Sequence, residues 1–262
     1  MAVLTTLHIA NGDADAPRLR STGYEHVLVW REALADGPVS PRPAELFPLR
    51  RSFVTTAYSS SEDEYQRVIE SEFHSIINGR WDEVILHFDT DLFCCVNCVF
   101  LLSQLGAVPR IVWDLRTSTI ELSTMDRAFL ASCWRAYAGP DPTIIEDLLK
   151  QTPSKLSHIA VALRAHLERF PNVRTKLGRP QELIEELLAR GLTEPEDLVQ
   201  AFIALDDNVY GWGDAQILRE RRSIETIRSG TAPMHIGGVT QRTTGPHWQW
   251  DPLKKRLVWS EE

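Results

Sequence analysis

Two aspartates separated by one residue follow a continuous apolar run in the first half of the chain. Asp89 and Asp91 come directly after residues 84–88, and a long apolar stretch over residues 92–105 follows them. Neighbouring carboxylates repel each other and raise each other's pKa unless a cation neutralises them. Divalent ions such as Mg²⁺ take oxygen ligands of this kind. The pair therefore predicts a metal site, with Asp89 and Asp91 as the ligands and Mg²⁺ as the expected ion.

Further polar residues follow the other strands that the sequence predicts. In an open α/β sheet, ligands bind outside the carboxyl ends of the strands. We therefore expect one site there, in which Arg31 meets a phosphate and Asp13 completes the metal shell directly or through water. His87 is a candidate acid or base, although a hydrogen-bonded core histidine is its commoner role. The expected catalytic residues are Asp13, Asp89, Asp91 and His87. The expected ligand-binding residues are Asn11, Gly12, Arg31, Glu32 and Asp114.

The same residues have structural interpretations. Asp commonly caps helices, so Asp91 could simply begin the helix that follows it. Asp89 could pair with Arg110 or Arg116. Residues 11–13, Asn-Gly-Asp, could form an ordinary turn, because Gly permits a left-handed backbone there. These alternatives compete with the metal site until the side chains are placed.

The elements that would position these residues alternate between strand and helix. Capping residues at Ser61 and Ser123 and a glycine stop at Gly106 delimit three predicted helices, over 61–78, 92–105 and 123–137. Four prolines within residues 38–48 predict an irregular loop. The alternation predicts an α/β fold with an open, mostly parallel, Rossmann-like sheet in a domain covering residues 1–138. The predicted strands cover 4–10, 26–30, 84–88 and 110–115.

Helical patterns dominate the second half of the chain. They are followed by alternating residues that predict a β-hairpin over 247–259. This order suggests a helical, winged-helix-like domain covering residues 139–262. Arginines and lysines near its end could form a basic stripe, but Glu220 and Glu225 interleave with them, which is typical of a solvated face. The predicted helices cover 143–150, 154–170, 180–190, 193–205 and 211–227.

Composition restricts the classes of protein. The chain has 262 residues and a formal net charge of -8, which disfavours nucleic acid as the main partner. The longest apolar run, over 94–102, falls short of the roughly 20 residues that a membrane span requires, so we expect a cytoplasmic protein without a membrane partner. The four cysteines have neither a disulfide framework nor a zinc spacing. Cys94, at a predicted helix start, could be a nucleophile, but the neighbouring acids oppose the thiolate.

Several segments resemble a known bacterial family. The segments LHIANGDADAPRL, VLVWREALADGPV and EVILHFDTDLFCCVNCVFLL occur in the order of the blocks of the family called domain of unknown function 1835. AYAGPDP, ALRAHLERFPNV and GPHWQWDPLKKRLVW resemble its C-terminal half. The resemblance covers nearly the whole chain and implies an architecture and a pocket, with family motifs falling on residues 11–13 and 89–92. It implies no particular activity.

The strand-end acids are also similar to the Toprim arrangement, in which a first-strand acid and a later Asp-x-Asp hold Mg²⁺ for phosphoryl chemistry. Asn11 stands where Toprim proteins have the first acid, and Asp13 is the neighbouring carboxylate. This departure weakens the predicted metal affinity.

These patterns favour an enzyme that acts on a small phosphate-bearing or nucleotide-like ligand at the strand ends. Metal-dependent phosphoryl transfer and hydrolysis are the reaction types that such acids suit. The expected partner is a small anionic molecule, and the helical half covers the pocket or forms a homodimer contact. The alternative is a regulatory protein that senses a small molecule and contacts DNA or a protein through its winged-helix-like part.

Overall fold

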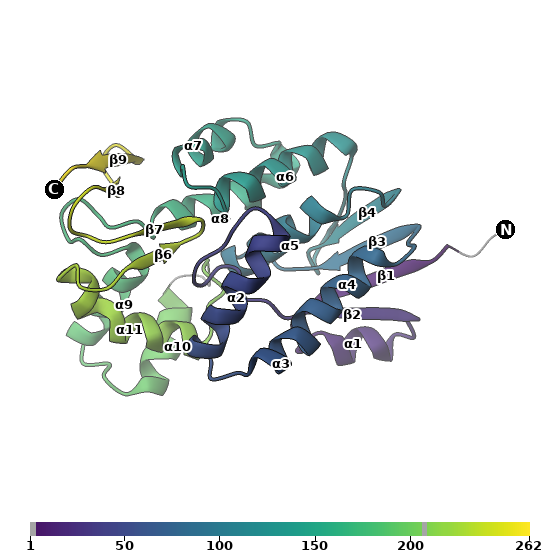
Figure 1. Ribbon diagram of the computed structural model, residues 1–262, viewed down its shortest axis with the longest axis horizontal. Coiled ribbons are helices and arrows are strands. Elements are labelled where there is room, and N and C mark those ends of the chain that lie inside the picture. The colour runs from purple at the N-terminus through teal and green to yellow at the C-terminus, as the bar shows by residue number, and fades with distance from the viewer. Residues whose placement is uncertain (1–3, 206–208) are drawn as a thin grey trace.

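A five-stranded sheet forms the centre of the N-terminal part in the computed structural model, which describes residues 4–205 and 209–262 (Figure 1). Its strands are β1 (Thr6–Asn11), β2 (His26–Trp30), β3 (Glu83–His87), β4 (Arg110–Asp114) and β5 (Thr119–Glu121). Their order is β2-β1-β3-β4-β5. The first four run parallel, and β5 pairs antiparallel with β4 at the edge. The predicted α/β fold with a mostly parallel sheet is therefore confirmed.

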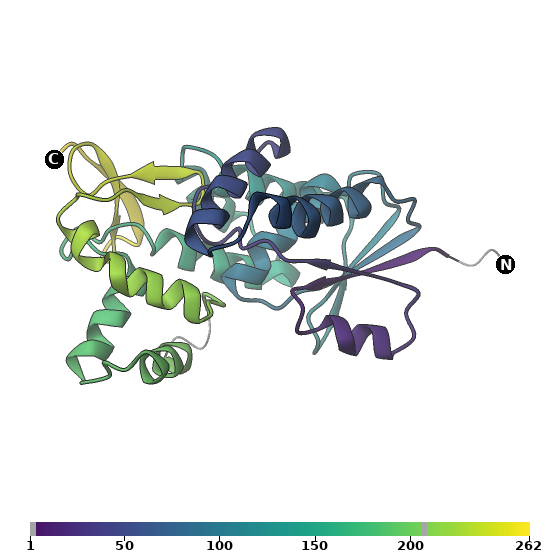
Figure 2. The ribbon, with the colours of Figure 1, turned by 60° about the horizontal axis from the view of Figure 1, so that its bottom comes forward.

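The helices of the N-terminal part cover the two faces of the sheet unequally. They are α1 (Ala16–Ser21), α2 (Pro43–Ala57), α3 (Glu62–Tyr65), the π-helical turn η1 (Gln66–Glu70), α4 (Ser71–Asn78), α5 (Leu92–Gln104) and α6 (Thr124–Tyr137). Alternate strand residues such as Leu7, Val84 and Trp113 join the large core, to which α2, α4, α5 and α6 contribute. α1 packs on the opposite face through Ala16 and Leu19 (Figure 2).

The prediction of a loop over residues 38–48 is wrong from residue 43 on, because α2 begins at Pro43. Pro43 lies in the first turn of the helix, where a missing N–H group leaves no helical hydrogen bond unmade. Pro48 lies inside α2, and the buried side chains of Phe47 and Arg50 anchor that stretch to the rest of the protein. Tertiary packing therefore overrides the local preference of proline.

The C-terminal part lies beyond the carboxyl ends of the strands (Figures 1 and 2). It contains α7 (Thr143–Lys150), the short η2 (Ser154–Leu156), α8 (Ser157–Leu167), α9 (Arg179–Ala189), α10 (Pro195–Leu205) and α11 (Asp214–Arg228). Two hairpins follow among the described residues, β6 (Met234–Ile236) with β7 (Val239–Gln241) and β8 (His247–Asp251) with β9 (Arg256–Ser260). The second hairpin was predicted and is confirmed, whereas the first was not predicted.

The β6–β7 hairpin contacts the N-terminal part through its glycine turn. Gly237 has a φ of 62°, a left-handed conformation that favours glycine. The N–H of Gly238 donates to the carbonyl oxygen of Tyr137, at 2.9 Å, at the end of α6. A Cβ atom at Gly238 would collide with the carbonyl oxygen of Ala138. Two adjacent glycines therefore let this turn approach the backbone closely.

One hydrophobic core includes buried residues from both parts of the chain. Leu92 and Val99 of α5 belong to it, as do Ile159 and Leu163 of α8. The domain boundary predicted after residue 138 stays a prediction. Within residues 4–205 and 209–262, no helix is both long and apolar enough to cross a membrane.

Candidate functional site

β1 and β3 flank the topological switch point of the sheet, where the order of successive strands reverses, because β2 and β3 lie on opposite sides of β1. Ligands of open α/β sheets bind at such points. Asn11 Nδ2 donates to Cys94 Sγ at 3.0 Å, and Asn97 Nδ2 donates to Asn11 Oδ1 at 3.0 Å. The structure thus brings residue 11 and the start of α5 together, as the sequence predicted.

Asp91 is the N-cap of α5, which confirms its structural interpretation. Its Oδ1 accepts a hydrogen bond from the Cys94 N–H at 2.8 Å. Burial raises the pKa of Asp91. Burial and the nearby Asp91 also raise the pKa of the Cys94 thiol, which therefore stays protonated and is a poor nucleophile.

Two carbonyl groups from the C-terminal part occupy the remaining donors at the start of α5. The Leu92 N–H donates to Val209 O at 2.8 Å, and the Phe93 N–H donates to Tyr210 O at 3.2 Å. A helix N-terminus can bind a phosphate only through free N–H groups. The chain itself therefore fills this position.

Arginines neutralise most of the strand-end carboxylates. Arg31 forms a bidentate pair with Asp13, with Nη2 to Oδ1 at 2.8 Å, and this hydrogen bonding lowers the pKa of Asp13. Arg116 contacts Asp15 at 2.8 Å and Asp89 at 3.2 Å. The predicted pairing of Asp89 with an arginine is confirmed for Arg116. These pairs remove much of the repulsion that a metal ion would otherwise relieve.

Among the described residues, one group of side chains at this edge is compatible with a metal ion. The ligand atoms of Asp89, Asp91 and Cys94 lie within 4.8 Å of one another.

Gly12 has a φ of 89° in the turn after β1, as expected for the predicted Asn-Gly-Asp turn. Both carboxylate oxygens of Asp13 accept hydrogen bonds from Arg31. This arrangement does not support the predicted role of Asp13 as a metal ligand.

Glu32 is buried and holds the loop after β2 to the helices. Its carboxylate accepts two hydrogen bonds from the fully buried Arg50, with Nη2 to Oε1 at 2.7 Å, and one from the Tyr65 hydroxyl at 2.5 Å. The Ala33 N–H also donates to it at 2.9 Å. These partners give Glu32 a structural task in place of the predicted contact with a ligand.

His87 and Asp114 lie together, in a chain of hydrogen bonds that continues to another histidine. His87 Nδ1 lies 2.8 Å from Asp114 Oδ2, and its Nε2 lies 3.0 Å from His8 Nδ1. The His8 ring stacks on Tyr24, with centroids 3.6 Å apart. Burial lowers the pKa of His87. His87 is therefore a hydrogen-bonded neutral histidine.

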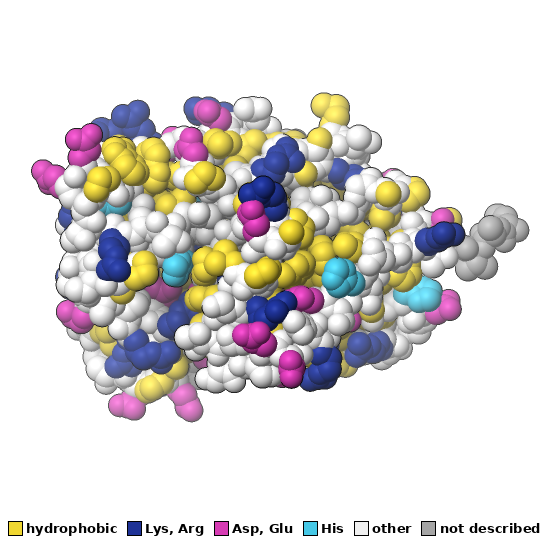
Figure 3. Space-filling model, viewed as in Figure 1, with side chains coloured by type: hydrophobic (Ala, Val, Ile, Leu, Met, Phe, Trp, Pro, Cys, Tyr) yellow, Lys and Arg dark blue, Asp and Glu magenta, His cyan; other side chains and the backbone are white. Residues whose placement is uncertain are grey.

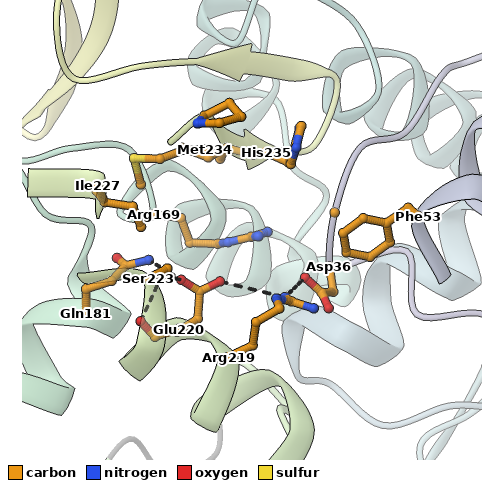
Figure 4. A pocket seen from close by; sticks show the side chains of 13 residues that line it. Asp36, Phe53, Arg169, Gln181, Arg219, Glu220, Ser223, Ile227, Met234 and His235 are labelled. Atoms are coloured by element: carbon orange, nitrogen blue, oxygen red, sulfur yellow. Dashed lines mark hydrogen bonds and ion pairs between the residues drawn. The ribbon is translucent and has the colours of Figure 1, made fainter. Parts of the chain in front are cut away.

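A cavity of about 240 Å³ lies between the two parts of the chain, and we call it the central cavity (Figure 4). Asp36, Gly37 and Phe53 line it from the N-terminal part, and the other walls come from α9, α11, the β6 region and the segment after α8. Other lining residues are Arg169, Gln181, Arg219, Glu220, Ser223, Ile227, Pro233, Met234, His235 and Ile236.

Asp36 joins the two parts at the wall of the central cavity. Its Oδ1 accepts a short hydrogen bond from Arg219 of α11, and its Oδ2 accepts one from the Tyr58 hydroxyl. Gln216 Nε2 donates to the same hydroxyl at 2.9 Å. Arg50 Nη1 donates to the backbone oxygen of Asp36. Both carboxylate oxygens of Asp36 therefore have partners.

Arg169 is a buried cation that forms no ion pair among the described residues, although its charge acts on the nearby Glu220 carboxylate and its side chain interacts with the Tyr137 hydroxyl. It is 5% exposed, and its guanidinium group forms no ion pair in the described part of the chain. Its Nη1 has no hydrogen-bond acceptor, and the same is true of Arg219 Nη1. The guanidinium carbon lies 5.4 Å from the centre of the Trp212 ring, and Figure 4 shows the side chain extending into the cavity. Because buried donors are normally hydrogen-bonded, these two unpartnered guanidinium nitrogens are available to the acceptor atoms of a ligand.

Glu220 lies next to these cations. Its Oε2 accepts from Gln181 Nε2 at 2.6 Å, and its Oε1 is 3.8 Å from Arg219 Nη2. Burial, with Asp36 nearby, raises the pKa of Glu220. A carboxyl group with a raised pKa keeps its proton at a higher pH than an exposed carboxyl group does. The cavity therefore combines cationic donors with a titratable acid.

The central cavity was missed by sequence reasoning, and Glu220 was wrongly placed on a solvated face. One signal was present. Ile217, Glu220, Ile224 and Ile227 recur at helical spacing, which puts the acid on the apolar face of α11. Glu225, on the other side of the helix, is exposed as predicted. No sequence pattern marked Arg169.

Comparison of the chain with family models, with curated proteins and with solved structures finds no match. The resemblance to domain of unknown function 1835 therefore stays a prediction, and the site must be interpreted from its own geometry.

Proposed function

We propose that the protein is an enzyme acting on a small anionic molecule that carries a phosphate or carboxylate group and binds in the central cavity. The buried, unpaired guanidinium of Arg169 is the observation that supports this proposal most strongly. Guanidinium groups match the geometry of carboxylates and phosphates. The location also agrees with the general rule for α/β sheets, because the C-terminal part covers the carboxyl edge of the strands.

The size of the cavity limits the ligand. Its volume of about 240 Å³ is below the roughly 300–1,000 Å³ of pockets for drug-sized molecules. A phosphate attached to a few carbon atoms suits this space better than a complete nucleotide, which narrows the ligand class expected from the sequence.

Two titratable groups in the cavity favour catalysis over binding alone. Glu220 has a raised pKa, and His235 lies on β6 with a pKa that burial lowers. Neutral imidazole and a protonated carboxyl are the forms that act as base and acid. Their position beside Arg169 and Arg219 would bring a proton donor and acceptor to a bound anion.

Thermal melts test this proposal with inorganic phosphate, glycerol phosphate and acetate as probes. A ligand at a hundredfold excess over its Kd adds about 2.7 kcal/mol to the unfolding free energy. We expect at least one phosphate probe to raise the Tm of the wild type and to lose this effect in Arg169→Met. Arg222→Met, which removes an exposed arginine from α11, is the matched control and should keep the shift. An unchanged Tm of the wild type with every probe would reject the proposal.

A metal site is the second candidate, because Asp89, Asp91 and Cys94 place two oxygens and one sulfur within 4.8 Å of one another. An all-oxygen site suits the predicted Mg²⁺, whereas a thiolate ligand favours Zn²⁺. Equilibrium binding of Zn²⁺ and Mg²⁺ to the wild type and to Asp91→Asn tests this candidate. Binding of either ion that is unchanged in Asp91→Asn would exclude this site.

The regulatory alternative, with a winged-helix-like C-terminal part that contacts DNA, has less support. Several arginines of the predicted basic stripe bind the protein itself. Arg221 Nη1 donates to Thr193 O at 2.8 Å, and Arg228 pairs with Glu185 at 2.6 Å. Basic and acidic side chains are interspersed on the face that Figure 3 shows.

A further inference from the structure

We propose that Glu220 makes the central cavity selective for an oxyanion that still carries a proton, so that it binds phosphate in preference to sulfate. The inference rests on the proposed anion-binding function and specifies the ligand. It concerns inorganic phosphate, or a phosphate ester in its singly protonated form.

The charges of the cavity are balanced before any ligand enters. The charged lining residues are two arginines and two acids, Arg169, Arg219, Asp36 and Glu220. Asp36 neutralises Arg219 through their ion pair. If Glu220 is ionised, an incoming anion gives the cavity a net negative charge. A proton that Glu220 takes up offsets one negative charge, and a proton carried by the anion lets the anion donate a hydrogen bond to the carboxylate.

Glu220 has a free acceptor position on the cavity side. Its Oε2 receives the Gln181 amide at 2.6 Å and lies 3.4 Å from Ser223 Oγ. Its Oε1 lies 3.8 Å from Arg219 Nη2 and accepts no hydrogen bond from a described residue. An ionised carboxylate can only accept hydrogen bonds. In Figure 4 the Glu220 carboxylate lies below the Arg169 side chain, and a dashed line joins it to Arg219. An oxyanion between them would meet donors on one side and an acceptor on the other.

Among the described lining residues, the other carboxylate does not offer the same position, and the unpartnered acceptor Gln181 Oε1 carries no charge. Both oxygens of Asp36 are occupied, by Arg219 and by Tyr58. His235 Nδ1 lies 2.9 Å from Thr240 Oγ1. The groups that influence the titration of Glu220 are Asp36 from the loop after β2, Arg169 after α8, Gln181 of α9 and Arg219 of α11.

The difference between the two anions is one proton. Hydrogen phosphate can donate its P–OH hydrogen to the Glu220 carboxylate, and hydrogen bonds with a charged partner are strong. Sulfate carries no proton at neutral pH, so its oxygen would meet a carboxylate oxygen. Sulfate therefore binds only after Glu220 itself takes up a proton. The raised pKa of Glu220 makes this easy in acid and difficult in base, so the preference for phosphate should grow with pH.

Isothermal titration of the whole protein with phosphate and with sulfate, at constant ionic strength, tests this inference. At pH 7.5 we expect phosphate to bind about tenfold more tightly or better, the ratio that one charged hydrogen bond gives. At pH 5.5 the ratio should shrink, because protonated Glu220 donates to either anion. The pH trend requires no variant, so it is measurable even if substitutions in the cavity impair folding.

Glu220→Gln is the informative variant. The amide is nearly isosteric, can still accept from Gln181 and can donate to sulfate, so the ratio should fall to within about twofold through tighter sulfate binding. Glu225→Gln makes the same chemical change on the exposed side of α11 and should keep the wild-type ratio.

The outcomes separate the inference from the function on which it rests. If neither anion binds the wild type at either pH, the anion-binding function fails and this inference fails with it. Equal binding of phosphate and sulfate at pH 7.5 would retain the anion site and overturn the role of Glu220. A preference that persists in Glu220→Gln would overturn it as well.

Discussion

The strand ends and the central cavity both gather charged side chains, but only the first region pairs nearly all of them. At the strand ends Asp13 has Arg31, Glu32 has Arg50 and Asp89 has Arg116. In the cavity, the Arg169 guanidinium forms no ion pair among the described residues, and its Nη1 has no acceptor. Charges that a protein pairs internally hold elements in place. A buried charge without a partner costs stability and is therefore a better indicator of a ligand.

The largest expected change in unfolding free energy comes from removing a charge of the internally paired region. Arg50→Met leaves the buried Glu32 carboxylate without its cation, and breaking a buried pair costs about 3–5 kcal/mol of unfolding free energy. Urea unfolding measures the loss. The double variant Glu32→Leu with Arg50→Met should recover much of it, because no lone charge remains. A cost of Arg50→Met below about 1 kcal/mol would show that this pair holds little of the structure.

The next effect has the opposite sign and comes from the cavity. Arg169→Met removes an unpaired buried charge, so in the absence of ligand the unfolding free energy should stay constant or rise by about 1 kcal/mol or more. Urea unfolding in a buffer free of phosphate and sulfate is the measurement, with Arg222→Met as the exposed control. A loss of stability comparable to that of Arg50→Met would mean that Arg169 is a structural cation, and the contrast between the two regions would disappear.

The smallest expected effect concerns Asp91, where structural and metal-binding interpretations coincide. Asp91→Ala removes the N-cap of α5 and should cost about 1 kcal/mol, whereas Asp91→Asn keeps a capping oxygen and should cost less. Thermal unfolding with a metal chelator present isolates the capping effect. Equal stability of the two variants would contradict a capping role.

Features that depend on local patterns could be predicted from the sequence. The four parallel strands follow from short apolar runs, and the N-cap of α5 follows from an aspartate ahead of an apolar stretch. The start of α2 could not be predicted, because its anchoring residues, Phe47 and Arg50, act through packing with distant elements. Local helix propensity carries no information about contacts between distant residues.

The central cavity depends on contacts between distant residues. Asp36 and Arg219 are separated by 183 positions, and neither belongs to a recognisable motif. The strand-end residues could be grouped from sequence because parallel strands place their carboxyl ends together, whatever the side chains do. That rule gives the correct edge of the sheet. It does not indicate which charges are satisfied there.

The two carbonyl groups that cap α5 also affect the order in which this chain can fold. Leu92 and Phe93 leave the ribosome long before Val209 and Tyr210, their acceptors. Until then the start of α5 has unmet donors, and the surface that α5 later buries against α8 is exposed to solvent. A nascent chain that stalls before α8 would therefore expose the apolar residues of α5 that α8 later covers.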